Sequence, residues 1–78
     1  MQAEILLRAL EELFADVEFG RRARIGGRSE TARRVVTYFV DRGIDPIDAR
    51  LLAQAYNAGA HHELHELAHA LDRAEERS

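Results

Sequence analysis

All four histidines of the chain lie between residues 61 and 69, and two of them complete a match to the zinc-binding pattern H-E-x-x-H. The match is His65-Glu66-Leu67-Ala68-His69. On a helix, histidines at i and i+4 can both bind one zinc ion, and a glutamate beside the first can act as a general base toward metal-bound water. The candidate metal ligands on this helical face are His62, His65, His69 and Asp72. The spacing raises two possibilities: a zinc peptidase, and a zinc or nickel site without catalysis.

The segment resembles the active-site helix of zincin peptidases over these five residues. In the metzincin pattern a glycine three residues after the second histidine lets the chain turn, so that a third histidine reaches the zinc. Here Asp72 and Glu75 occupy those two positions inside a predicted continuous helix. We therefore expect no catalytic residues, no enzyme and no bound cofactor, with zinc as the alternative. We expect this side of the helix to be exposed to solvent, with His65 and His69 paired with Asp72 and Glu76.

Arginine supplies all eleven basic residues of the chain, and lysine is absent. Between residues 20 and 34 the chain has only one acidic residue, Glu30, and six arginines: Arg21, Arg22, Arg24, Arg28, Arg33 and Arg34. Guanidinium groups bind carboxylates and phosphates with two parallel hydrogen bonds. Three glycines in the same stretch predict a loop, so we expect an arginine-rich loop that contacts a protein partner or, as the alternative, nucleic acid.

Length and composition indicate one small domain, residues 1–78. A chain of 78 residues has a small core, which makes association with another protein or a second copy a real source of stability. The absence of cysteine removes disulfides and thiolate zinc sites, and it favours an intracellular setting. No stretch is long and apolar enough to span a membrane. We expect a cytoplasmic protein with no membrane contact.

Apolar residues at helical spacing predict an all-α fold, a compact bundle of about four short helices. The expected helices cover approximately residues 3–17, 30–42, 46–58 and 61–77. Between the first two we expect the loop, with a possible short β-hairpin near residues 17–25, and Ser29 is the expected N-cap of the second helix. Because residues 35–40, "VVTYFV", are β-branched or aromatic throughout, a strand is the alternative there.

The boundary between the second and third helices is marked by Gly43, Ile44 and the pair Asp45-Pro46. These two helices have the outline of a helix-turn-helix motif. However, a third helix used for DNA recognition would bring Asp45 and Asp48 to the phosphates, where their charge is repelled. We therefore do not expect DNA recognition by the third helix.

Surplus apolar residues on the first and third helices indicate association. The apolar arc of the first helix covers about half its circumference, and the third helix is apolar on two sides. On the third helix, Ile47, Leu51, Ala55 and Ala58 are expected to be buried. The expected apolar contacts with a partner are Leu7, Phe14, Leu52 and Tyr56.

The sequence thus predicts a non-catalytic interaction or regulatory module of the accessory or inhibitor kind, which self-associates, plausibly as a homodimer, or docks on a larger protein. Nucleic-acid binding through the arginines and metal binding on the fourth helix are the two alternatives.

Overall fold

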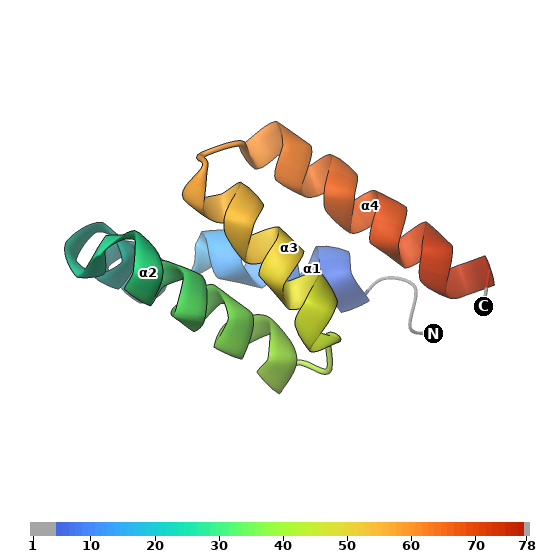
Figure 1. Ribbon diagram of the computed structural model, residues 1–78, viewed down its shortest axis with the longest axis horizontal. Helices are drawn as coiled ribbons and strands as arrows, with labels where there is room; N and C mark the ends of the chain where they lie inside the picture. Colours follow the sequence, from blue (N-terminus) through green and yellow to red (C-terminus); the bar gives the residue numbers. More distant parts are fainter. Residues whose placement is uncertain (1–4, 78) are drawn as a thin grey trace.

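A computed structural model describes the backbone of residues 5–77 and the side chains of residues 5–74, and within that part all regular secondary structure is α-helical (Figure 1). The helices are α1 (Ile5–Ala15), α2 (Val17–Asp41), α3 (Pro46–Asn57) and α4 (His61–Arg77). The all-α prediction is confirmed. The predicted start of the first helix at Ala3 lies outside the described residues.

Helix α1 ends earlier than its apolar pattern predicts. Its core residues are Leu6, Ala9, Leu10 and Leu13, all buried. Val17 was expected to extend this stripe, but its side chain is 84% exposed. The reason lies in Asp16, whose carboxylate accepts a hydrogen bond from the Phe19 amide at 2.9 Å and so starts a new helix.

The expected loop and β-hairpin at residues 17–29 are wrong, because this stretch is helical. Helix α2 is divided by Gly27, whose φ of +80° lies outside the helical range, into a first arm (Val17–Gly26) and a second arm (Arg28–Asp41). The Thr31 hydroxyl bridges the break, because its single hydrogen is shared between the carbonyl oxygens of Ala23 and Gly27, which lie 3.1 and 2.7 Å from the hydroxyl oxygen. Ser29, the expected N-cap, lies inside the helix.

The turn between α2 and α3 follows the prediction. Gly43 has a φ of +90°, and the Ile44 amide donates to the Phe39 carbonyl at 3.0 Å. Asp45 caps α3 by accepting from the Ile47 amide at 2.8 Å, and Pro46 occupies the first helical position. The strand alternative for residues 35–40 is wrong: they form the last turns of α2 and bury Val35 and Phe39.

Helix α3 buries the opposite side from the one we expected. Ala49, Leu52 and Ala53 are buried, whereas Ile47 is 69% exposed and Leu51 is 43% exposed. Two of the three buried residues of α3 are small, Ala49 and Ala53, and α2 and α3 form the most extensive contact between helices. Close packing therefore decides the orientation, and it leaves the larger Ile47 and Leu51 outside.

Candidate functional site

The six arginines of the predicted loop all lie on α2. Three are on the first arm, Arg28 follows the break at Gly27, and two are on the second arm. In Figure 1 the bend of α2 forms one end of the molecule, away from the α2–α3 turn and the end of α4. We call residues Val17–Arg28 the elbow. It carries four arginines and one acidic residue, Glu18.

Most of these arginines have partners. Arg21 and Arg22 share one carboxylate oxygen of Glu18, at 2.7 and 3.1 Å, and these two hydrogen bonds lower the pKa of the Glu18 carboxyl. Since two guanidinium groups share one carboxylate, the cluster of Glu18, Arg21 and Arg22 has a net positive charge. Arg24, on the same arm, has no ion pair among the residues that the structure describes. The elbow therefore has an excess of positive charge.

Two exposed apolar side chains lie among these arginines. Val17 and Ile25 are 84% and 79% exposed, more than any other large apolar side chain of the described residues. They are eight residues apart, so they lie on one side of the arm, roughly 12 Å from each other, with Arg21 between them. Arg24 borders the same side. Arg21 and Arg24 thus lie beside an apolar pair on the exposed surface of the elbow.

This pair was missed at the level of sequence because Val17 was expected to end the first helix and Ile25 to lie in the loop that follows it, with a possible β-hairpin there. The signal is the spacing of Val17, Arg21 and Ile25 at i, i+4 and i+8, which places them on one side of a helix about one turn apart.

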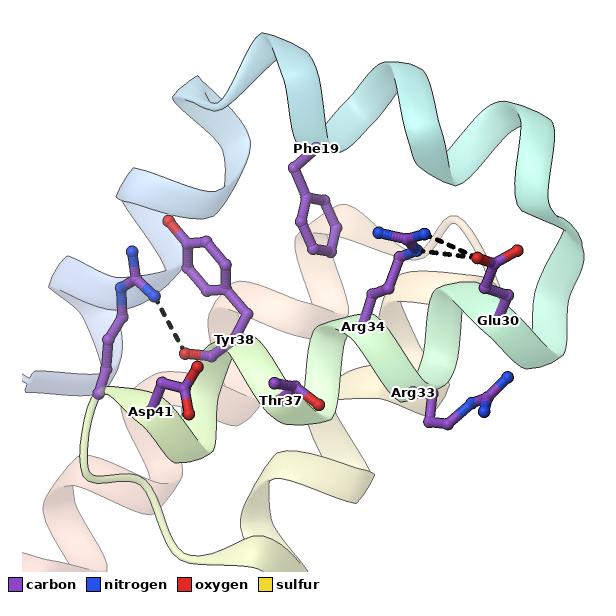
Figure 2. A pocket seen from close by; sticks show the side chains of 8 residues that line it. Phe19, Glu30, Arg33, Arg34, Thr37, Tyr38 and Asp41 are labelled. Carbon is purple, nitrogen blue, oxygen red and sulfur yellow. Dashed lines mark hydrogen bonds and ion pairs between the residues drawn. The ribbon is translucent and has the colours of Figure 1, made fainter.

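A groove of about 450 Å³ separates the two arms of α2, and Figure 2 shows the side chains that line it. Phe19 of the first arm and Tyr38 of the second meet edge to face, with ring centroids 5.5 Å apart. The Arg42 guanidinium lies 3.5 Å from the centroid of the Tyr38 ring and also bonds Glu12 of α1 at 3.0 Å. Burial raises the pKa of the Tyr38 hydroxyl. These contacts hold the first arm against the rest of the bundle.

Arg33 and Arg34 lie at the edge of this groove. Figure 2 shows Arg34 bonded to Glu30 one turn earlier, where the shortest nitrogen–oxygen distance is 2.7 Å. The same hydrogen bonds lower the pKa of the Glu30 carboxyl. Arg33 points away from this pair and has no ion pair within the described residues. Of the six predicted arginines, Arg24 and Arg33 are therefore the most available, and they lie on different arms.

The histidines of α4 lie mainly against aromatic rings and a glutamate. The rings of His61 and His65 lie 4.8 and 5.8 Å from that of Phe14, and His62 pairs with Glu66 at 3.0 Å. Asp72 is buried. In the described part of the chain, no three side chains of the metal-binding types come together. The side chain of Glu76, an expected partner of the histidines, lies outside the described residues.

The four predicted apolar contact residues do not share one exposed surface. Leu52 is fully buried in the core, where no partner can reach it. Leu7 and Tyr56 are half-buried and pack against the core, and burial raises the pKa of the Tyr56 hydroxyl. Phe14 is partly exposed, with His61 and His65 beside its ring.

A second, larger groove lies by the α2–α3 turn, next to the start of α1 and the end of α4. We call it the turn groove; its volume is about 770 Å³. Its apolar lining comes from Ile5, Leu6, Val40, Ile44, Pro46 and Leu71. Asp45 and Asp48 also line it. The turn groove thus combines apolar and acidic groups, in contrast to the elbow, where apolar residues lie among basic ones.

No protein-family model matches the chain, no curated protein is detectably similar to it, and no solved structure matches its fold. None of the helices in the described part of the chain has the length and apolar character needed to cross a membrane.

Proposed function

We propose that this protein is a non-catalytic interaction module and that its contact surface is the elbow of α2. The observation that carries the proposal is the exposed pair Val17 and Ile25 among four arginines. Exposed apolar side chains rimmed by polar or charged groups mark an interaction site where they form a contiguous patch. Arginine is enriched in protein–protein interfaces, where its long side chain gives both apolar contact and hydrogen bonds.

The chemistry of the elbow favours an acidic protein surface with an apolar centre. Such a surface would bury Val17 and Ile25 and would offer carboxylates to Arg24 and to the charge left over beside Glu18. A nucleic-acid backbone would use the charge but would leave the apolar pair in water, because phosphate contacts are made by polar and basic groups. Arg33, which also has no ion pair among the described residues, lies on the second arm and outside this pattern.

Helix α3 is also poorly placed to read DNA. It lies beside the second arm of α2 over its whole length, from the Phe39–Ile44 hydrogen bond at the turn to hydrogen bonds between Arg28 and Asn57 at the far end. The two helices form an antiparallel pair, whereas the helices of a helix-turn-helix motif cross steeply.

The test compares two double variants that make the same chemical change at different places. Arg24→Glu with Ile25→Asp alters the elbow, and Arg50→Glu with Leu51→Asp alters an exposed part of α3. Wild type and both variants are immobilised and exposed to nuclease-treated lysate of the source organism, and the retained proteins are identified by mass spectrometry. We expect a defined acidic protein, or the protein itself, on the wild type and the α3 variant, and its loss on the elbow variant.

Retention that is equal on all three proteins would contradict the proposal. So would material that is retained before nuclease treatment and lost after it, which would instead indicate nucleic-acid binding.

A further inference from the structure

The structure contains an acidic, apolar surface of the kind that the elbow fits, and it lies on the same molecule. We infer that the elbow of one copy docks into the turn groove of a second copy, so that copies associate head to tail. This inference rests on the proposed function, since it takes the elbow as the contact surface, and it adds the identity of the partner.

Charge is the first argument for a second copy. The elbow, residues 17–28, has four arginines and one glutamate, whereas residues 41–48, around the turn, have three aspartates and one arginine. That arginine, Arg42, is already bonded to Glu12. The turn therefore has uncompensated negative charge, and Asp45 and Asp48 place part of it in the turn groove. Opposite potentials on two surfaces steer their encounter and fix their relative orientation.

Apolar complementarity is the second argument. Ile25 projects into solvent, with Arg21 and Arg24 on the same side of the arm. The turn groove is lined by Ile5, Val40 and other apolar side chains next to its two aspartates, and its volume of about 770 Å³ is in the range of clefts that receive ligands. An isoleucine in the groove with arginines beside the aspartates satisfies both kinds of group. Contact between two elbows, or between two turn grooves, would bring like charges together.

Placement on the molecule is the third argument. The molecule measures 39 × 20 × 20 Å, and Figure 1 places the bend of α2 at one end of the long axis, with the start of α1, the α2–α3 turn and the end of α4 toward the other. A copy that uses its elbow therefore keeps its turn groove free. Joined end to end in this way, copies make a heterologous contact, which produces open chains or closed rings; only an antiparallel pair that makes both contacts at once would be a two-fold dimer.

The test uses one variant of each surface. The elbow variant is Arg24→Glu with Ile25→Asp, and the groove variant is Val40→Glu with Asp48→Arg. Arg24, Ile25 and Val40 are exposed, and Asp48 is half-buried. Circular dichroism establishes that each variant is folded. Sedimentation velocity then gives the mass distribution of the wild type, of each variant, and of an equimolar mixture of the two.

We expect the wild type to form species larger than a dimer as its concentration rises, and these species to dissociate in high salt. Each variant alone should be monomeric. In the mixture, the intact elbow of the groove variant meets the intact groove of the elbow variant, so the mixture should form a dimer and stop there.

A wild type that stays monomeric at every concentration would overturn the inference. So would a mixture of the two folded variants that stays monomeric. A dimer that forms in the wild type and persists in the groove variant would also overturn it. In any of these cases the proposed function still stands if the elbow variant loses a different captured protein. If the elbow variant changes neither self-association nor capture, both fail.

Discussion

Arg28 and Asn57 each donate a side-chain hydrogen bond to the other's main-chain carbonyl oxygen. The Asn57 amide reaches the Arg28 oxygen at 2.8 Å, and the Arg28 guanidinium reaches the Asn57 oxygen at 3.2 Å. Arg28 follows the break in α2, and Asn57 is the last residue of α3. A cation at the carboxyl end of a helix also interacts favourably with the helix dipole. The base of the elbow is therefore fixed to the bundle by two residues 29 positions apart.

Replacing Asn57 by alanine should weaken this attachment. The variant loses the amide donor to Arg28, and a hydrogen bond of this kind contributes about 1 kcal/mol to the free energy of unfolding. Gln54→Ala, at an exposed position one turn earlier on α3, is the matched control and should change stability little. Urea denaturation measures both, and equal losses in the two variants would show that the Arg28–Asn57 pair contributes nothing specific.

Gly27 and Gly20 should respond in opposite ways to substitution by alanine. Gly27 has φ +80° and ψ 174°, a region populated essentially by glycine, so Gly27→Ala should destabilise the protein by about 1–3 kcal/mol. Gly20 lies within the first arm with open space around its Cα, so Gly20→Ala should stabilise it by about 0.5–1 kcal/mol through helix propensity. Thermal unfolding of both variants checks this, and a stabilising Gly27→Ala would mean that the two arms form one straight helix.

Local signals in the sequence were sufficient for the turn between α2 and α3. The turn is set by the positive φ of Gly43, the helix cap of Asp45 and the fixed φ of Pro46. Each of these effects is local, so the turn can be predicted without knowing the rest of the fold. The first arm of α2 was missed because three glycines within twelve residues are typical of loops. The cap at Asp16, ion pairs one turn apart and the packing of Phe19 on Tyr38 all support a helix there.

The buried side of α3 was not predictable from periodicity, because both sides of the helix are apolar. The choice depends on how closely α2 can approach, which favours the small Ala49 and Ala53 over the larger Ile47. The candidate site likewise depended on structure that residue type alone does not give. Residue type identified the arginines, but which of them lie beside Val17 and Ile25 follows only once residues 17–26 are known to be helical.

Zinc should leave the thermal stability of the protein unchanged. His65 and His69 have the spacing of a zinc pair, but His65 lies against Phe14 and no third ligand joins them among the described residues. A ligand that binds only the folded state raises the melting temperature in proportion to its affinity. We expect equimolar zinc to have the same negligible effect on the wild type and on His65→Ala with His69→Ala. A saturable rise that the double variant abolishes would establish a metal site on α4.

Stability should fall at alkaline pH through two tyrosines. The chain has no lysine and no cysteine, so Tyr38 and Tyr56 are its only side chains with an ordinary pKa near 10. Burial raises the pKa of both hydroxyls in the folded state. The folded protein then binds more protons than the unfolded chain above pH 10, and the free energy of unfolding decreases as the pH rises from about 10 through the raised pKa values.

Replacing both tyrosines by phenylalanine should flatten this alkaline decrease, because phenylalanine keeps the ring contacts with Phe19 and removes the titrating hydroxyls. Urea denaturation of the wild type and of Tyr38→Phe with Tyr56→Phe, measured at intervals between pH 8 and 11, gives the two slopes. Tyr38→Phe also removes the interaction of the Tyr38 hydroxyl with Arg42, so the comparison rests on the two slopes and not on the stability near neutral pH. An equally steep decrease in both would mean that the hydroxyls are as well hydrated in the folded state as in the unfolded chain.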